Sequence, residues 1–218
     1  MLKLASIFHK IYRAAMDYDA ELIETNPLVE TTEEKFIAVD ARLIIDDNAL
    51  YRHPEFQRRL VEDLPELTSR EVEARKSGLA YVKINGNIGV VGNGAGLVMA
   101  TLDLIQLYGG RPADFLDVGG GASSDKVEKA LNIVLSDPNV EVAFINILGG
   151  ITRCDQVAKG IVEARRNLRF RKPIVIRLVG TNEDEGKRIL TEAGIQVFES
   201  MEEAAKKAVE IAEKGSRP

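Results

Sequence analysis

From Ala80 to the end of the sequence, short apolar runs alternate with segments of helical periodicity. Runs rich in β-branched and aromatic residues are typical of buried strands, and apolar residues spaced three and four apart are typical of helices. We expect strands at 88–91, 115–118, 142–148, 174–178 and 196–198, and helices at 96–108, 124–135, 156–167, 182–193 and 201–214. This alternation predicts an α/β domain with a doubly wound, flavodoxin-like parallel sheet covered by helices on both faces.

Glycine-bearing turns follow four of the expected strands, at Gly92–Gly96, Gly119–Gly121, Gly149–Gly150 and Gly180. Because parallel strands end at the same edge of a sheet, these turns should lie together. Backbone N–H groups at helix N-termini favour an anion, and the absent side chains allow it to approach. One such turn, taken alone, is better explained as an ordinary strand-to-helix turn. The prediction of an anion-binding edge therefore depends on the presence of four such turns.

Two of these turns have further interpretations. The small residues of Gly94-Ala95-Gly96 would also let their helix pack closely on the sheet. Thr152, which follows Gly149-Gly150, would cap the next helix or donate its hydroxyl to the same anion.

Several function classes are disfavoured. Gly92–Gly96 reads G-x-G-x-G, which is a weak match to the dinucleotide fingerprint, and the sequence holds no G-x-x-x-x-G-K-[ST] loop. A net charge of -5 argues against nucleic acid or an anionic membrane surface as the main partner. The single cysteine, Cys154, excludes an internal disulfide framework and fits a reducing cytoplasm.

The N-terminal part has a different pattern. Residues 3–19 predict an amphipathic helix, and residues 20–23 and 36–43 predict an antiparallel pair of strands. This pairing would set Asn26 beside Asp40, with Glu24 on the same face as Asn26, and Mg²⁺ prefers such oxygen ligands. From the residues alone, a turn asparagine and a surface aspartate are the simpler interpretation. The polar stretch 46–77 predicts a domain boundary near residue 75.

Several motifs together resemble one family. Asn26-Pro27-Leu28-Val29 followed by Asp40, and the segments 86–89, 93–97, 115–122 and 149–155, closely resemble the β subunit of succinate–CoA ligases, also called succinyl-CoA synthetases. The resemblance covers essentially the whole chain. In that family the β subunit begins with the larger part of an ATP-grasp domain. Residues 1–75 therefore look like the C-terminal remnant of that domain and 76–218 like the flavodoxin-like CoA-ligase domain, so the chain looks like a C-terminal fragment.

The resemblance implies a role for particular residues. Asn26 and Asp40 match the Mg²⁺ ligands that hold the nucleotide phosphates, and Glu24 matches a catalytic glutamate that steadies a phosphohistidine. Asn93 and the loop Gly150-Ile151-Thr152 match the succinate-binding positions. Thr152 stands where an apolar residue is expected, which leaves malate as an alternative acid.

The implied reaction converts succinate, CoA and ATP or GTP, reversibly, to succinyl-CoA, the nucleoside diphosphate and phosphate. An α subunit would supply the phosphohistidine and the CoA site in a heterodimer or heterotetramer, and neither His9 nor His53 lies in a glycine-rich turn. The chain alone is therefore expected to be inactive, and cytoplasmic. A non-catalytic, flavodoxin-like module that binds an anion or nucleotide is the alternative from another class.

Overall fold

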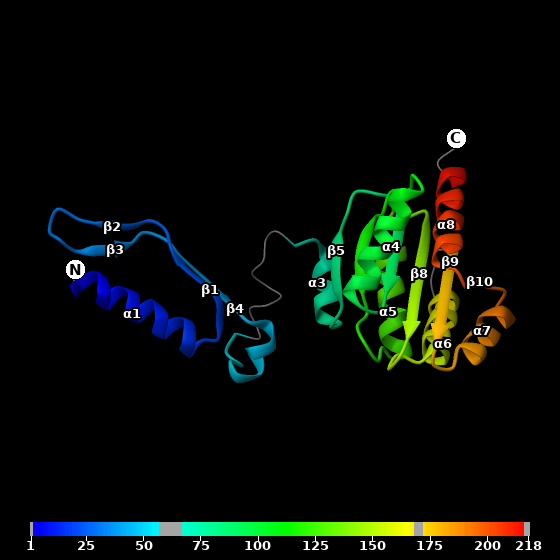
Figure 1. The fold of residues 1–218 in the computed structure, drawn as a ribbon, viewed down its shortest axis with the longest axis horizontal. Coiled ribbons are helices and arrows are strands. Elements are labelled where there is room, and N and C mark those ends of the chain that lie inside the picture. Colours follow the sequence, from blue (N-terminus) through cyan, green and yellow to red (C-terminus); the bar gives the residue numbers. More distant parts are fainter. Residues whose placement is uncertain (1, 57–66, 168–171, 216–218) are drawn as a thin grey trace. The chain divides into compact units, whose positions relative to one another are not determined.

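The computed structural model describes residues 2–56, 67–167 and 172–215, and the chain divides into two compact units, residues 1–65 and 66–218 (Figure 1). The division lies upstream of the predicted boundary near residue 75 because α3 (Ser69–Lys76) belongs to the second unit. The Arg70 guanidinium on α3 donates to the Ser136 carbonyl oxygen at 3.0 Å and pairs with the Asp137 carboxylate. A capping box between Thr68 and Glu71 starts this helix.

Unit 2, residues 66–218, is a six-stranded sheet in the order β10-β9-β8-β6-β7-β5. Its strands are β5 (Ala80–Lys83), β6 (Ile88–Gly92), β7 (Asp114–Asp117), β8 (Val142–Gly149), β9 (Ile174–Gly180) and β10 (Val197–Phe198). Numbered along the chain from β6, the five parallel strands follow the order 2-1-3-4-5, which confirms the predicted flavodoxin-like winding.

The sequence pattern did not predict β5. This strand pairs antiparallel with β7 and adds an edge to the parallel sheet. It has four residues with an alternating burial pattern, in which Tyr81 is buried and Val82 is exposed. Such a short, half-exposed strand leaves little hydrophobic signal, because only one of its faces packs against the protein.

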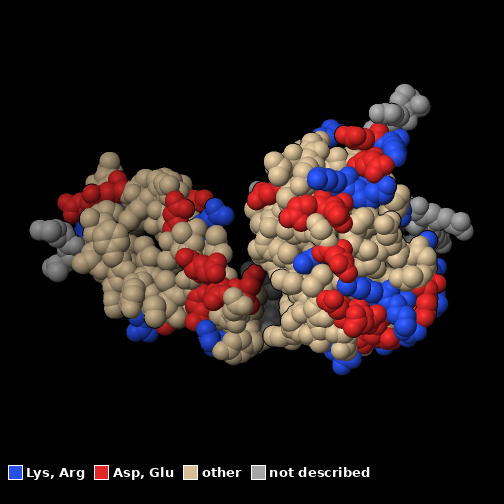
Figure 2. Space-filling view, turned by 45° about the vertical axis from the view of Figure 1, so that its right-hand side comes forward, with Lys and Arg blue, Asp and Glu red and all other residues tan. Residues whose placement is uncertain are grey.

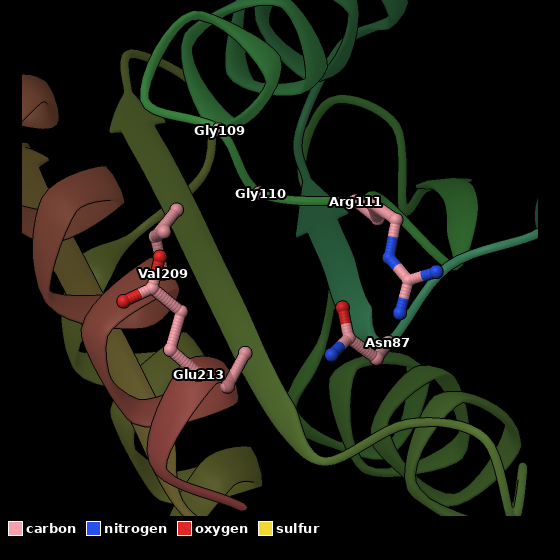
Figure 3. A pocket seen from close by; sticks show the side chains of 7 residues that line it. Asn87, Gly109, Gly110, Arg111, Val209 and Glu213 are labelled. Carbon is pink, nitrogen blue, oxygen red and sulfur yellow. The ribbon is translucent and has the colours of Figure 1, made fainter. Parts of the chain in front are cut away.

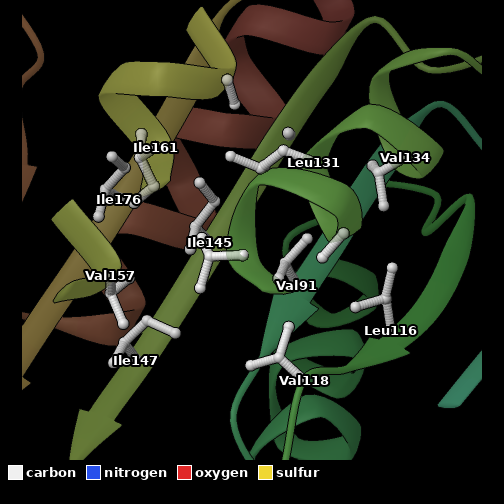
Figure 4. Packing of buried hydrophobic residues seen from close by; sticks show 14 of the residues in the cluster. Val91, Leu116, Val118, Leu131, Val134, Ile145, Ile147, Val157, Ile161 and Ile176 are labelled. Carbon is white, nitrogen blue, oxygen red and sulfur yellow. The ribbon is translucent and has the colours of Figure 1, made fainter. Parts of the chain in front are cut away.

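Five helices connect and cover the parallel strands, close to the predicted bounds: α4 (Ala95–Leu107), α5 (Ser124–Leu135), α6 (Cys154–Asn167), α7 (Glu183–Glu192) and α8 (Met201–Gly215). Side chains from α4 and α8 pack on one face of the sheet around Phe144. Those from α5, α6 and α7 pack on the other face around Ile145 and Ile147 (Figure 4). Successive residues of β8 point to opposite faces, so this strand supplies the centre of both cores.

Unit 1, residues 1–65, contains α1 (Leu2–Asp17), β1 (Ala20–Thr25), β2 (Leu28–Glu30), β3 (Phe36–Ala38), β4 (Ala41–Ile45) and the 3₁₀ helix η1 (Asp47–Arg52). The predicted antiparallel pairing is confirmed, but it forms two separate ladders. β1 pairs with β4, and β2 pairs with β3. The hairpin is interrupted between the two ladders, at Asn26-Pro27 in its first strand and at Val39-Asp40 in its second.

Unit 1 has little interior of its own. Among its described residues, Ala49 is the only hydrophobic residue that is fully buried. His53 is also buried, where its Nε2 lies 2.8 Å from Asp19 Oδ2 and its ring lies beside Tyr18 and Phe56. The broad uncharged area on unit 1 in Figure 2 contrasts with the interspersed basic and acidic residues of unit 2.

Candidate functional site

The glycine turns of unit 2 meet at the carboxyl edge of the sheet, as predicted. Hydrogen bonds join each turn to a neighbour. The Gly121 N–H donates to the Thr152 hydroxyl at 2.9 Å, which joins the turns after β7 and β8. The Thr181 N–H donates to the Gly149 carbonyl oxygen at 3.1 Å, which joins the turns after β8 and β9. The rim, defined here as residues 92–96, 119–122, 149–153 and 180–182, is therefore one connected structure.

Asp117 occupies part of this rim. Its Oδ1 accepts hydrogen bonds from the Gly94 N–H at 2.6 Å and the Gly119 N–H at 2.7 Å. These two amides belong to the set predicted to receive an external anion, and the protein's own carboxylate uses them instead. The bond to Gly119 spans two residues, as in an Asx turn, so Asp117-Val118-Gly119 carried a local signal for it. The bond to Gly94 depends on the tertiary fold.

The turn after β9 is also closed from within. The Gly180 N–H donates to Glu183 Oε2 at 2.5 Å. The buried Asp155 carboxylate accepts hydrogen bonds from Arg153 and from the Asn182 side chain. The Arg153 bond is the main reason why the pKa of Asp155 falls to about 2. The protein's own carboxylates therefore hold this turn in place.

Asn93 and Thr152, both predicted to bind succinate, contact each other. Asn93 Nδ2 donates to the Leu148 carbonyl oxygen at 2.9 Å and to Thr152 Oγ1 at 3.3 Å, while its Oδ1 accepts from the Leu148 N–H. Thr152 is only 1% exposed. Its hydroxyl oxygen accepts bonds from Gly121 and Asn93 and none from an α6 amide, so the expectation that this hydroxyl caps α6 is wrong, while its contact with an anion stays a prediction.

Gly150 and Ile151, the other two predicted substrate contacts, are open to solvent. Ile151 is 88% exposed. The N–H groups of both residues have no hydrogen-bond partner among the described residues. The same holds for Ala95 and Gly96 in the first turn of α4, whose N-cap, Gly94, supplies no side chain. These amides are among those of the rim that remain available to an anion.

The rim glycines differ in whether the structure leaves space for a Cβ atom. A Cβ on Gly149 would lie 2.7 Å from the Thr152 carbonyl oxygen, and one on Gly92 would lie 2.7 Å from Val98 Cγ2. Gly92, not Gly94 or Gly96, thus permits the close approach of α4 predicted from the sequence. A Cβ on Gly150 would meet no described atom within 4 Å, and its φ is not positive. The fold therefore does not require glycine at position 150.

A second group of predicted residues lies in unit 1. Glu24, Asn26 and Asp40 line a hollow of about 270 Å³ together with Ala41 and Arg42. Asn26 Nδ2 donates to Glu24 Oε1 at 3.1 Å, and Asp40 Oδ1 accepts from the Ala41 N–H at 2.8 Å. The remaining oxygens, Asn26 Oδ1 and Asp40 Oδ2, have no hydrogen-bond partner among the described residues. One amide oxygen and one carboxylate oxygen fit the ligand preference of Mg²⁺, which keeps waters or phosphate oxygens at its other positions.

Other features are less informative about chemistry. Figure 3 shows a hollow of about 410 Å³ at the amino-terminal edge of the sheet, with Val209 and Glu213 of α8 facing Asn87 and Arg111. It lies at the opposite end of the strands from the rim. Within the described residues, acidic, histidine and cysteine side chains form no cluster of three that would hold a metal, and none of the helices is long and apolar enough to cross a membrane.

Comparison with known proteins decides the family. The model of the CoA-ligase family matches residues 91–211, which lie within unit 2 and include the whole rim. The chain belongs to the CoA-ligase family. Over 209 residues it is 54% identical to the succinate–CoA ligase [ADP-forming] subunit beta of Pyrobaculum islandicum, and over 216 residues 53% identical to that of Aquifex aeolicus. These alignments include 95% and 98% of this chain but only 55% and 56% of the relatives.

The CoA-ligase chain thus spans about half the length of the curated relatives that it matches. Their names give succinate, and not malate, as the acid of these relatives. Among solved structures, ATP citrate lyase from Methanothrix soehngenii in complex with citrate and coenzyme A aligns with a TM-score of 0.76 at 19% identity. The alignment covers 94% of this chain and 58% of the lyase chain. At this identity the likeness confirms the fold alone.

Proposed function

We propose that the chain works as part of the β subunit of a succinate–CoA ligase. With an α subunit that supplies a phosphohistidine and the CoA site, it would interconvert succinate, CoA and ATP or GTP with succinyl-CoA, the nucleoside diphosphate and phosphate. The CoA-ligase family match and the similarity to ADP-forming β subunits support this assignment. A cytoplasmic location is part of the proposal, because the buried thiol of Cys154 would stay reduced there.

The observation that carries the proposal is the open loop at Gly150 and Ile151. Its amides have no described partner, and a Cβ on Gly150 would meet no described atom within 4 Å. Oriented N–H groups stabilise a carboxylate without a cationic side chain, because each donates a charge-assisted hydrogen bond. The open amides of Ala95 and Gly96 on α4 belong to the same edge, so one dicarboxylate has donors from two turns.

Unit 1 would hold the nucleotide end of the reaction. Asn26 and Asp40 would bind Mg²⁺, which when bound neutralises phosphate charge, and Glu24 would steady the phosphohistidine brought by the α subunit. The contact between Glu24 and Asn26 supports a shared location for these roles. The proposal assigns the phosphate to the hairpin of unit 1 and the acid's carboxylate to the rim of unit 2.

Partners are proposed from exposed apolar side chains. Phe8, Tyr12 and Met16 lie four residues apart on α1 and are each about 60% exposed. They support the interpretation of unit 1 as the last part of an ATP-grasp domain, whose remainder would cover them. Near the end of β8, Leu148 is 53% exposed, and the rim residue Ile151 is 88% exposed; these two side chains would lie against the α subunit.

Reconstitution tests the function. The chain, the α subunit from the same organism and a polypeptide matching the remainder of the β relatives would be mixed with CoA, Mg²⁺-ATP or Mg²⁺-GTP, and succinate or malate. We expect succinyl-CoA formation that requires all three polypeptides and is slower with malate. Binding of succinate or nucleotide without turnover would instead indicate the anion-binding module.

The metal assignment has its own test in the reconstituted enzyme. Asp40→Ala should raise the Mg²⁺-nucleotide concentration needed for half-maximal activity at least about tenfold while sparing assembly, because one of two proposed protein ligands is lost. Asp46→Ala serves as the control, since this carboxylate caps η1 in the same unit and accepts from the Asn48 N–H. An unchanged Mg²⁺ dependence in Asp40→Ala would remove Asp40 from the site.

A further inference from the structure

Thr152 is the point where three turns of the rim are joined. Its hydroxyl oxygen accepts from the Gly121 N–H of the turn after β7 and from Asn93 Nδ2 of the turn after β6. Thr152 itself belongs to the turn after β8. A hydroxyl oxygen has two acceptor lone pairs, and both are used here. The residue is almost fully buried, so this oxygen has no open path to a ligand.

Asn93 is committed in the same way. Its two amide hydrogens donate to the Leu148 carbonyl oxygen and to Thr152 Oγ1, and its oxygen accepts from the Leu148 N–H. A carboxylate could receive a hydrogen bond from Asn93 only by replacing one of these acceptors. The donors that need no such exchange include the backbone amides of Gly150 and Ile151, directly before Thr152.

We propose that Thr152 is a positioning residue, whose hydroxyl ties the turns after β6 and β7 to the turn after β8 and so fixes the Gly150–Ile151 amides that receive the acid's carboxylate. The inference rests on the proposed function for the identity of the acid. It assigns side chains and backbone to different tasks, because Thr152 and Asn93 hold the loop while the backbone amides contact the ligand. Loss of the hydroxyl leaves the Gly121 N–H and Asn93 Nδ2 without this acceptor, and the loop loses its anchor.

Thr101 provides a matched control. Its side chain is also buried, and its hydroxyl also accepts from an asparagine amide, Asn146 Nδ2, at 2.8 Å. Thr101 lies on α4 and Asn146 lies within β8, and neither side chain makes a hydrogen bond to a rim turn. Thr101→Val and Thr152→Val therefore delete the same chemical group in similar surroundings. Only the second deletion should affect how the acid binds.

The experiment measures kinetics of the reconstituted ligase with Thr152→Val, Thr152→Ser and Thr101→Val. We expect Thr152→Val to raise the KM for succinate about tenfold, with kcat and the nucleotide KM within about twofold of wild type. Thr152→Ser, which keeps the hydroxyl, should restore the succinate KM. Thr101→Val should lower the melting temperature by a similar amount to Thr152→Val and leave the succinate KM unchanged.

Three results would overturn the proposal: an unchanged succinate KM in Thr152→Val, an equal rise in Thr101→Val, or no rescue by serine. A wild-type assembly that forms no acyl-CoA would mean that the proposed function has failed. Hydrogen exchange of the chain alone then decides the positioning role. The Gly121 and Leu148 amides should exchange faster in Thr152→Val than in Thr101→Val, and equal rates would exclude a tie between the turns.

Discussion

The two units use apolar side chains in opposite ways. Unit 2 buries large residues such as Phe144, Ile145 and Ile147 completely, on both faces of one sheet. Unit 1 leaves Phe8, Tyr12 and Val39 about 60% exposed. A large exposed apolar surface is uncommon on a self-sufficient domain and is typical of an interface. The comparison indicates that unit 2 has a core of its own, and we propose that another polypeptide segment covers the exposed apolar side chains of unit 1.

The largest expected effect comes from separating the units. A fragment of residues 66–218 should unfold cooperatively on heating, because both cores of the sheet remain intact. A fragment of residues 1–65 should show weak helical signal and a broad transition, because a chain of this size with so few buried residues is marginal. Far-ultraviolet circular dichroism during heating measures both. A sharp transition in a monomeric 1–65 fragment would contradict the comparison.

A matched pair of phenylalanine substitutions tests the same contrast at single residues. Phe144→Ala should lower the free energy of unfolding by about 3–5 kcal/mol, since it leaves a cavity in the core beside α4 and α8. Phe8→Ala should change it by about 0.5 kcal/mol or less, because Phe8 is 61% exposed. Chemical denaturation gives both values. In the reconstituted enzyme, by contrast, Phe8→Ala should weaken assembly more than Phe144→Ala does. A large loss of stability from Phe8→Ala would oppose this interpretation.

The sequence predicted the strongly periodic parts of the fold. The five parallel strands and their helices were found because continuous apolar runs and helical spacing persist over many residues in a sheet that is buried on both faces. The edge strand β5 was missed, since four half-exposed residues carry little pattern. The division of the unit 1 hairpin was missed too, because the interruption at Asn26 and Asp40 depends on the register of two strands.

The rim shows the same limit at the level of the site. Parallel topology was enough to predict that the glycine turns gather at one edge. It was not enough to predict which amides stay open, because side chains distant in sequence occupy some of the others. Asp117 reaches Gly94 across 23 residues, and Asn93 reaches Thr152 across 59. Such pairs form only when the strands are adjacent, and the sequence marks neither partner.

Two adjacent glycines of unit 2 differ in whether the fold requires them. Gly149→Ala should lower the free energy of unfolding by about 1–3 kcal/mol, because its Cβ would press on the Thr152 carbonyl oxygen and the Cys154 sulfur. Gly150→Ala should leave stability within about 0.5 kcal/mol, since its Cβ would meet open space. Thermal denaturation measures the difference.

Gly150→Val in the reconstituted enzyme should instead raise the acid's KM more than the nucleotide's, and equal effects would argue against a carboxylate at this loop.

The last prediction concerns a buried acid in unit 2 that lacks a full set of partners. Asp114 Oδ1 accepts from the Val90 N–H at 3.0 Å, but Oδ2 has no partner among the described groups. Burial raises the pKa of Asp114 to about 8. The folded state therefore binds more protons than the unfolded state between pH 4 and pH 8, so the stability contributed by protonated Asp114 falls as pH rises through that window. The slope is at most about 1.4 kcal/mol per pH unit.

Asp114→Asn should remove this slope and stabilise the protein at pH 8 by about 1–2 kcal/mol, since an amide occupies the site without ionising. Asp137→Asn is the control of opposite sign. Burial tends to raise the pKa of Asp137, but the Asn139 N–H together with Lys83 and Arg70 holds it below its usual value. Loss of that carboxylate should therefore destabilise the protein at neutral pH. Denaturant unfolding from pH 4 to pH 8 distinguishes the two, and an unchanged slope in Asp114→Asn would show that this carboxyl is ionised inside the core.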